Sequence, residues 1–542
     1  MFHGGRIVAR ALKAEGIDHV FTLCGGHIQN IYDGCIDEGI RVVDVRHEQT
    51  AGHAADGYAR VTGKPGVALV TAGPGVTDVV TAVANAQRAG VPMVVIGGAG
   101  PLAYKHMGSL QDMDHVELMR PITKWSAAVT EARRLEEFVS MAFRAATTGV
   151  PGPVFLEMPL DVLMNFVSDG DLVRPTKYRT ENVAGPDPRA IEDAVRLLEG
   201  AKKPVLLVGS QFRWSRERGA LASLLAKRPM PTFVNGMARG ALDPAHPCFF
   251  SRSRRGALRG ADVVLVFGTP FDFRLDYGRE GTFAADVKII QVDLDPREIG
   301  RNRAVDVGIV GDSGLTLAAL EAALPKSTAD GWLTEMRAAE SKKLAEMAAE
   351  MQSDASPLNP LRACAEVAKY VDQDTIVVGD GGDFVATAAY TLPVRWPGVW
   401  MDPGPLGTLG VGPGYAMAAK LARPGSRVII MYGDGSFGLH AMEWEAMARQ
   451  GINVVGVIGN DAGWTQILRG QRDLFGEART VATKLAFTPY ERVAEACGAK
   501  GFYAETPAQL TKALEEAFAA NAPALVNVKL GASDFRKGAI SV

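Results

Sequence analysis

Short, mainly apolar runs alternate with longer stretches of helical periodicity along most of the chain. Such runs occupy residues 42–45, 67–71, 93–96 and 153–157, and then residues 204–208, 232–234, 263–267 and 288–292. A fully apolar run of roughly four to eight residues is typical of a strand that is buried on both faces of a parallel sheet. The alternation of such strands with helices therefore predicts an α/β fold built on parallel sheets.

Two polar stretches divide this pattern into three segments. Residues 168–188 are rich in proline and charge, and residues 326–360 are polar, with a charged helix predicted over residues 338–351. The 542 residues are more than a single hydrophobic core usually holds. We therefore predict three doubly wound parallel-sheet domains over residues 1–167, 188–325 and 357–530, followed by a C-terminal tail over residues 531–542.

Polar residues follow two neighbouring apolar runs in the third segment. The run 428–432 leads into Gly433-Asp434-Gly435-Ser436, a helix is predicted over residues 439–449, and the run 454–458 leads into Gly459-Asn460-Asp461-Ala462-Gly463-Trp464. Parallel strands of such a unit end at the same sheet edge, where ligands bind. Magnesium takes oxygen ligands, few from protein and the rest from phosphates and water. The predicted protein ligands are the Asp434 carboxylate, the Asn460 side-chain oxygen and the Ala462 carbonyl.

A second pattern lies in the first segment, where an apolar strand over residues 40–45 ends in Arg46-His47-Glu48-Gln49 and a helix of small residues begins at Glu48. A carboxylate at the start of a helix can be a partner of the helix dipole and nothing more. The family resemblance that the two motifs carry together instead makes Glu48 a candidate catalytic residue.

These two motifs together resemble the thiamine-diphosphate enzymes, whose signature is Gly-Asp-Gly followed at this spacing by Asn. The resemblance covers nearly the whole chain. The order of the predicted domains is similar to that of the acetolactate-synthase family, which has a pyrimidine-binding, a middle and a diphosphate-binding domain. Further matching runs are Thr71-Ala72-Gly73-Pro74-Gly75, Val292-Asp293-Leu294-Asp295-Pro296 and Gly407-Thr408-Leu409-Gly410. The resemblance implies thiamine diphosphate and Mg²⁺ as cofactors.

The resemblance also implies roles for individual residues. Glu48 would bind the pyrimidine ring nitrogen and favour the tautomer that accepts the C2 proton. Leu409 would hold the cofactor bent, or it is a plain core leucine. A carboxylate at Asp383 would repel the diphosphate unless it is protonated or turned toward a donor. The other implied cofactor contacts are Pro74, Gly382, Phe384, Gly407, Gly433, Gly435, Ser436, Asn460, Ala462, Gly463 and Trp464.

Three departures argue against acetolactate synthesis. Leu110 and Arg469 stand where acetolactate synthases have aromatic residues, and Asp383-Phe384 replaces Gln-His. The runs Cys24-Gly25-Gly26-His27-Ile28 and Asp380-Gly381-Gly382-Asp383-Phe384 look instead like the 2-hydroxyacyl-CoA lyase branch. That branch implies cleavage of a 2-hydroxyacyl-CoA to formyl-CoA and an aldehyde or ketone, or the reverse carboligation. The alternative is an acetolactate synthase or a related 2-oxoacid decarboxylase or carboligase, and a third class is a non-catalytic subunit.

The lyase interpretation assigns the remaining candidate catalytic residues. The base that removes the substrate hydroxyl proton is His27, Asp383 or the cofactor itself, and His27 is equally well explained as a structural histidine. Gln111 would bind the hydroxyl or carbonyl oxygen. Arg536 and Lys537 of the tail would meet CoA phosphates, or they form a solvated pair at a frayed terminus.

The middle domain could hold a nucleotide. Asp293, Asp295, Arg274 and the run Gly209-Ser210-Gln211 follow apolar strands, so we expect them at strand ends where ADP or the CoA adenine could lie. No GxGxxG fingerprint follows a strand, which argues against FAD.

Composition limits the remaining classes. A net charge of −3 without a basic tract argues against nucleic-acid binding, and no apolar run reaches the roughly 18 residues that span a membrane. Five scattered cysteines without CxxC spacing argue for a reducing compartment, so we expect a cytoplasmic enzyme. In the family, Glu48 and the diphosphate site belong to different subunits. The resemblance therefore implies a homodimer or homotetramer with shared active sites.

Overall fold

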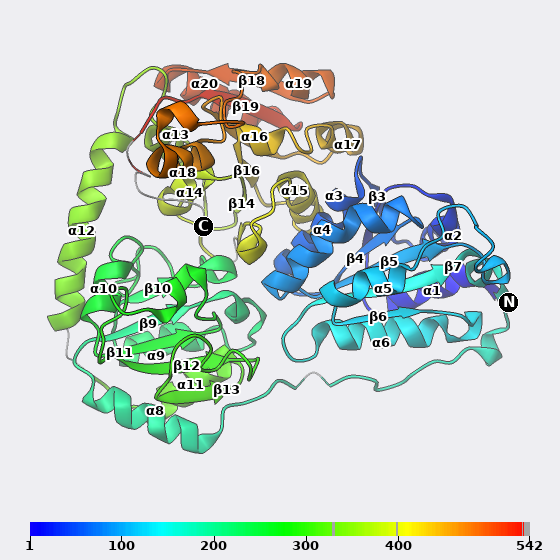
Figure 1. The fold of residues 1–542 in the computed structure, drawn as a ribbon, viewed down its shortest axis with the longest axis horizontal. Coiled ribbons are helices and arrows are strands. Elements are labelled where there is room, and N and C mark those ends of the chain that lie inside the picture. Colours follow the sequence, from blue (N-terminus) through cyan, green and yellow to red (C-terminus); the bar gives the residue numbers. More distant parts are fainter. Residues whose placement is uncertain (181, 328–330, 397–398, 534, 536–542) are drawn as a thin grey trace.

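A computed structural model describes residues 1–180, 182–327, 331–396, 399–533 and 535, which form three α/β domains (Figure 1). In this view the first domain lies at the right, the middle domain at the lower left and the third domain at the top. Each domain is built around one parallel sheet, so the predicted fold class is confirmed.

The first domain contains a six-stranded sheet in the order β3-β2-β4-β5-β7-β6. Its central strands are buried on both faces, as their apolar sequences require. The strands are β2 (His19–Thr22), β3 (Arg41–Asp44), β4 (Gly66–Val70), β5 (Met93–Ala99), β6 (Trp125–Ala128) and β7 (Pro153–Pro159). The helices are α1 (Gly4–Ala14), α2 (Gln29–Asp37), α3 (Glu48–Thr62), α4 (Pro74–Ala89), α5 (His115–Met119), α6 (Leu135–Thr147) and α7 (Leu160–Met164). A short antiparallel pair, β1 (Phe2–His3) and β8 (Phe166–Val167), joins the two ends of the domain.

The middle domain contains a five-stranded sheet in the order β10-β9-β11-β12-β13. Its strands are β9 (Pro204–Val208), β10 (Thr232–Val234), β11 (Val263–Phe267), β12 (Lys288–Asp293) and β13 (Val307–Val310). Its helices are α8 (Pro188–Gly200), α9 (Ala220–Lys227), α10 (Arg254–Gly260) and α11 (Ser313–Ala323).

The third domain repeats the strand order of the first domain, with a six-stranded sheet in the order β15-β14-β16-β17-β19-β18. Its strands are β14 (Ile376–Asp380), β15 (Val399–Met401), β16 (Val428–Gly433), β17 (Val455–Asn460), β18 (Lys500–Ala504) and β19 (Ala524–Lys529). Its helices are α13 (Pro360–Ala368), α14 (Asp383–Thr391), α15 (Gly412–Ala422), α16 (Asp434–Phe437), α17 (Glu443–Gln450), α18 (Thr465–Phe475), α19 (Tyr490–Ala496) and α20 (Pro507–Ala519).

The helix predicted over residues 439–449 is wrong in its first turn. The chain forms the short helix α16 at Asp434, passes through turns, and enters α17 only at Glu443. Leu439 and Met442 are exposed in these turns. The predicted strands agree with the structure to within a few residues, because buried parallel strands carry uninterrupted apolar runs.

The first and third domains share one hydrophobic core through helices α3 and α15, which lie side by side (Figure 1). Small residues permit this close approach: a Cβ atom at Gly57 would lie 2.8 Å from the main chain of Tyr415. A buried network then joins the helices. Asp56 accepts hydrogen bonds from Arg60, Asn85 and the Tyr415 hydroxyl, at 2.6, 3.0 and 2.8 Å.

The middle domain is connected to the third domain by the long helix α12 (Gly331–Met351), which runs along the left edge of Figure 1. Buried Glu340 of this helix accepts hydrogen bonds from the main-chain N–H groups of Ser251, Arg252 and Ser253. These bonds fix the helix against the middle domain.

Part of the C-terminal tail also contacts the middle domain. The Arg252 guanidinium lies 4.7 Å from the ring of Phe535 and 4.3 Å from the ring of Tyr390 on α14. The predicted phosphate contacts Arg536 and Lys537 lie outside the residues that the structure describes. Within the described parts of the chain, no helix is long and apolar enough to cross a membrane.

Candidate active site

A cavity opens at the carboxyl edge of the third sheet, where β14, β16 and β17 end. Its lining brings together most of the residues that the sequence assigns to the cofactor: Gly382, Asp383, Phe384, Gly407, Leu409, Gly433, Asp434, Gly435, Ser436, Gly463 and Trp464. The sequence missed Asp461, Thr465 and Gln466, which line the same cavity. They follow Asn460 along the chain. Whether they face the cavity depends on the path of the loop, which the sequence does not show.

Asp434 follows β16 directly and is the first residue of α16. Its carboxylate accepts hydrogen bonds from the N–H groups of Gly435 and Gly463, at 2.8 and 3.0 Å. Burial, with a contribution from nearby Asp461, raises the pKa of Asp434 to about 6. A bound cation would therefore stabilise a charge that the site alone disfavours.

Asn460 ends β17, and its side chain is oriented by its neighbours. The amide nitrogen donates to the Asn527 side chain at 3.1 Å and to the Thr488 carbonyl at 3.2 Å. The side-chain oxygen accepts from the N–H of Ala462, which has a positive φ of 54°. The oxygen therefore faces the same loop that holds Asp434 through Gly463.

These donors fit a magnesium ion in chemical type. One carboxylate, one amide oxygen and one main-chain carbonyl are the oxygen ligands that Mg²⁺ prefers. The described residues contain no cluster of three or more His, Cys, Asp or Glu side chains suited to a metal. The predicted set needs no such cluster, because Asp434 alone belongs to these residue types. The metal ligands remain a prediction.

The turn after β14 packs closely against the turn after β16. Gly381 has a φ of 143°, and a Cβ atom there would lie 2.7 Å from the Gly433 nitrogen. Helix α14 then begins at Asp383, and no side chain caps its N-terminus. The first turn of a helix leaves N–H groups without intrahelical acceptors, which favours a phosphate there. The N-terminus of α14 therefore offers this cavity N–H groups that suit a phosphate.

The loop that carries Leu409 is held by a residue that the sequence analysis missed. Buried Asp380, the last residue of β14, accepts hydrogen bonds from the N–H groups of Gly410 and Gly412, at 2.9 and 2.8 Å. Burial raises the pKa of Asp380 to about 7. Because Asp380 directly precedes the glycine turn, its position at the strand end could be predicted from the sequence. Its hydrogen-bond partners, about 30 residues further along the chain, could not.

Asp383 lies beside the expected diphosphate position, and its carboxylate is turned toward a donor. The Arg469 guanidinium of α18 binds both carboxylate oxygens, one of them at 3.0 Å. The sequence analysis required the Asp383 carboxylate to be either protonated or turned toward a donor, and the structure shows it turned toward a donor.

In the first domain, Glu48 is the first residue of α3 and is buried. Burial raises the pKa of Glu48, and the nearby Asp78 carboxylate adds to the increase. A carboxyl group that keeps its proton more readily than usual suits a hydrogen bond to a ring nitrogen. His47 caps the helix and accepts a hydrogen bond from the N–H of Gln49, which fixes the helix start.

His27 and Gln111 lie on the same edge of the first sheet. The His27 ring is 3.2 Å from the Thr71 hydroxyl, and burial lowers the pKa of His27, so its ring is neutral. Gln111 has a positive φ of 62° and packs against Gly73, which precedes Pro74 at the start of α4.

His115 is a further residue of this edge that sequence reasoning missed. It accepts a hydrogen bond from the Gly73 N–H at 2.8 Å and contacts Glu157 at 2.8 Å on its other ring nitrogen. It therefore holds the turn that leads into Pro74. Nothing in its local sequence marks this role.

The site residues thus form two groups within one chain. Among the described residues, the lining of the cavity in the third domain includes neither Glu48 nor His27 nor Gln111. The group in the first domain contains candidate catalytic side chains, whereas the cavity in the third domain contains the predicted diphosphate and metal positions.

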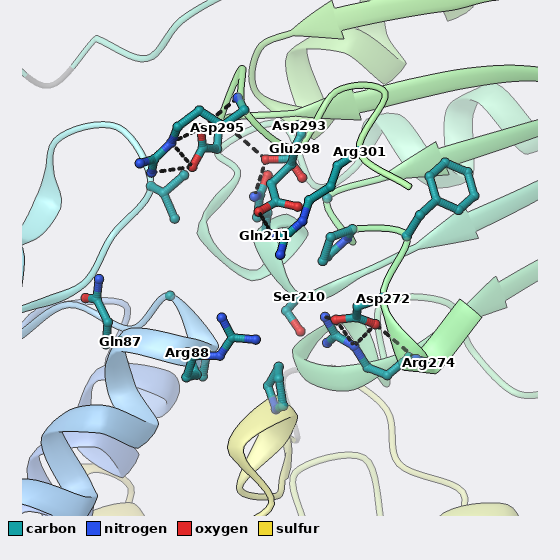
Figure 2. Close-up of a pocket in the computed structure, with 18 of the residues that line it drawn as sticks. Gln87, Arg88, Ser210, Gln211, Asp272, Arg274, Asp293, Asp295, Glu298 and Arg301 are labelled. Carbon is teal, nitrogen blue, oxygen red and sulfur yellow. Dashed lines mark hydrogen bonds and ion pairs between the residues drawn. The ribbon is translucent and has the colours of Figure 1, made fainter. Parts of the chain in front are cut away.

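A second candidate region lies between the first and middle domains (Figure 2). Arg88 of α4 and Arg301 of the middle domain point into this cavity, and Arg274 is paired with Asp272 at 2.7 Å. Asp293, the last residue of β12, accepts hydrogen bonds from Gln211 at 2.7 Å and from the Asp295 N–H at 2.8 Å. Its second oxygen is buried and has no hydrogen-bond partner among the described residues. Because Asp293 has no exposed surface, it orders the wall of this cavity through Gln211 and the Asp295 main chain.

A third cavity lies between the middle and third domains and adjoins the other two. It shares Gly381, Gly382 and Gln466 with the cofactor cavity, and it shares Ser210 and Arg274 with the cavity of Figure 2. Arg239 and Arg254 also line it, and the buried Nε of Arg239 has no partner within the described chain. A long anionic molecule could therefore extend from one end of this path to the other.

This architecture matches an enzyme that binds thiamine diphosphate between an N-terminal and a C-terminal domain. Models of the thiamine pyrophosphate enzymes match the chain in three parts: the N-terminal TPP binding domain over residues 2–118, the central domain over residues 191–320 and the C-terminal TPP binding domain over residues 380–528. The chain belongs to the thiamine pyrophosphate enzyme family, which indicates thiamine diphosphate, the same compound, as its cofactor.

The curated relatives place the chain in the acetolactate-synthase-like branch but carry two different names. A probable acetolactate synthase of Mycobacterium bovis is 43% identical over 528 residues, which cover 97% of this chain and 95% of the relative. A 2-hydroxyacyl-CoA lyase 2 of Bos taurus is 40% identical over 584 residues, which cover 100% and 92%. The human 2-hydroxyacyl-CoA lyase 2 is 38% identical over 586 residues, with the same coverage. The choice between these activities rests on the site.

Proposed function

We propose that the protein is a thiamine-diphosphate- and magnesium-dependent lyase that cleaves a 2-hydroxyacyl-CoA to formyl-CoA and an aldehyde or ketone, or performs the reverse carboligation. The observation that carries this proposal is the path of three adjoining cavities with arginines along it. A CoA thioester is long and carries phosphates, and such a path suits it. Pyruvate, the small substrate of the alternative activity, needs no such path.

The two ends of the path suit the two ends of the substrate. Arg88, Arg274 and Arg301, which line the cavity of Figure 2, can bind the phosphates of the CoA part. Asp402 and Trp400 line the middle stretch beside Arg239, where the pantetheine chain would lie. The Phe535 ring, against Tyr390, borders this stretch.

Bound thiamine diphosphate supplies a carbon nucleophile and an electron sink. The residues of the chain bind and orient the reactants around it. The neutral ring of His27 can take the proton from the substrate hydroxyl, since burial keeps it unprotonated. Asp383 is less suited to this role, because Arg469 already binds both of its oxygens. Gln111 would orient the substrate oxygen.

The two groups of site residues would meet between subunits. We propose a homodimer or homotetramer in which Glu48, His27 and Gln111 of one chain face the cofactor cavity of another. Exposed apolar residues near both groups support this arrangement: Met107, Leu110, Ile467, Leu474 and Phe475. Buried in an interface, they would cease to contact water.

Acetolactate synthesis is the second candidate, because a relative with that name is 43% identical. Two residues argue against it. Leu110 is 77% exposed at the edge of the first sheet, and Arg469 is bound to Asp383. The resemblance to acetolactate synthases implies aromatic residues at or near these two positions.

Substrate length tests the path directly. We expect the 2-hydroxyacyl-CoA to have a KM at least about tenfold below that of the matching pantetheine ester, because only the CoA ester carries phosphates to Arg88, Arg274 and Arg301. Arg274→Gln should remove this difference with little effect on kcat. Arg189→Gln is the matched control, since Arg189 also pairs with an aspartate, Asp187, is 87% exposed and lines none of the three cavities. Equal KM values for both esters in the parent enzyme would contradict the path.

A further inference from the structure

The cofactor cavity has an unusual balance of charge. Among the described residues of its lining, Asp383, Asp434 and Asp461 are acidic and none is basic. The ligand expected there carries a diphosphate, so each carboxylate needs a partner before an anion can enter. A bound Mg²⁺ ion would neutralise the Asp434 carboxylate. Asp383 needs a different partner.

Asp383 is also placed where it could compete with the diphosphate. It is the first residue of α14, whose N-terminus has no side-chain cap. Acidic side chains in the first turn of a helix are attracted by the N–H groups and the positive end of the dipole. A free Asp383 carboxylate would therefore swing toward the groups that are expected to bind the diphosphate.

The structure has this carboxylate bound elsewhere. Arg469, one turn into α18, binds both oxygens in the two-pronged manner that makes arginine–carboxylate pairs strong and directional. Both side chains are largely buried, with exposed fractions of 15% and 17%, so water screens the pair only partly. Leu468 is the only buried residue described in α18, so few other contacts hold that helix in place.

We propose that Arg469 is a positioning residue of the diphosphate site: it holds the Asp383 carboxylate away from the N-terminus of α14 and neutralises it, so that the diphosphate can bind there. The inference concerns cofactor binding and holds for either of the two candidate reactions. An ordinary structural ion pair differs in one testable respect. In an ordinary structural pair, replacing either partner should have a similar effect on cofactor affinity. In this pair, only the replacement of Arg469 should weaken cofactor binding.

The test measures the dissociation constant of thiamine diphosphate at a fixed Mg²⁺ concentration in four full-length proteins: the parent, Arg469→Gln, Asp383→Asn and the double variant. Trp464 lines the cavity and packs on Gly435, so its fluorescence is a built-in probe, and Trp464→Phe identifies its signal. Inorganic diphosphate, as a competitor, reports on the diphosphate end alone. Arg472→Gln is the matched control, because Arg472 lies on the same helix and pairs with Glu477 at the surface.

We expect Arg469→Gln to raise the dissociation constant about tenfold or more, since it leaves a carboxylate beside the anion. Asp383→Asn should bind as tightly as the parent or tighter, and the double variant should match Asp383→Asn. Arg472→Gln should change binding by less than about twofold. The thermal midpoints of the cofactor-free proteins separate loss of folding from loss of affinity.

Equal weakening in Arg469→Gln and Asp383→Asn would overturn the proposal, as would a double variant as weak as Arg469→Gln. Unchanged affinity in all variants would overturn it as well. A parent protein that binds no thiamine diphosphate would instead overturn the cofactor assignment, and so the two failures are distinguishable.

Discussion

Three carboxylates of the site differ because their surroundings differ. Glu48 is buried in an environment that favours its proton, Asp434 is held by two main-chain N–H groups at the predicted cation position, and Asp383 is bound by Arg469. The same functional group is therefore suited to a hydrogen bond with a ring nitrogen, to metal binding, and to a neutralised pair. These differences produce separate expectations for each residue.

Glu48→Gln should leave the cofactor bound but slow turnover by about a hundredfold or more, because an amide cannot exchange the proton that the ring nitrogen requires. The measurement is kcat together with the thiamine diphosphate dissociation constant. Normal turnover in this variant would show that Glu48 only stabilises the helix start.

The affinity for Mg²⁺ should depend on pH through Asp434. Its pKa in the metal-free protein is raised to about 6, so below that pH the ion must displace a proton. We expect the dissociation constant for Mg²⁺ to be flat above about pH 7 and to rise about tenfold per pH unit below about pH 6. Calorimetric titration in buffers of different ionisation enthalpy should detect the released proton. A pH-independent affinity between pH 5 and 8 would remove Asp434 as a ligand.

At the scale of elements, the joint between α3 and α15 depends on buried polar groups. Tyr415→Phe removes a hydroxyl that donates to Asp56 at 2.8 Å and accepts from Asn85 at 2.9 Å. The unsatisfied groups should lower the free energy of unfolding by about 1–3 kcal/mol, measured by urea denaturation. Tyr503→Phe, at an exposed tyrosine of β18, is the control and should cost less than about 0.5 kcal/mol. Equal effects of the two changes would mean that the network does not stabilise the joint.

The sequence predicts strands better than it predicts the turns between them. Buried parallel strands are marked by their apolar runs, and the start of α3 at Glu48 was correct because a strand end precedes it. The helix start at Leu439 was wrong because exposed apolar residues in turns imitate helical spacing. Contacts between distant residues, such as His115 with Glu157 or Asp380 with Gly412, leave no local pattern.

At the scale of the whole molecule, the first and third domains have the same strand order although their sequences show no clear repeat. Strand order depends on which apolar runs pair, and many different sequences satisfy it. The residues around Asp434 and Gly463 that line the cavity of the third domain could be predicted to lie together, because they follow two strand ends in a short stretch of chain. The pairing of Asp383 with Arg469, 86 residues away, could not.

The proposed sharing of sites between subunits predicts complementation. Glu48→Gln and Asp434→Ala should each be inactive alone. After they are mixed, unfolded and refolded together, about half of the dimers are mixed, and one of the two sites in each mixed dimer carries no substitution. We therefore expect about a quarter of the parent activity to return. No recovery despite formation of mixed dimers would place each complete site within one chain.

The most direct test of the proposed function is product analysis by mass spectrometry. The purified protein is incubated with Mg²⁺ and thiamine diphosphate, once with a 2-hydroxyacyl-CoA and once with pyruvate. We expect formyl-CoA and the shorter aldehyde or ketone from the first incubation, and no acetolactate from the second. Acetolactate from pyruvate, without cleavage of the CoA ester, would contradict the lyase and identify an acetolactate synthase.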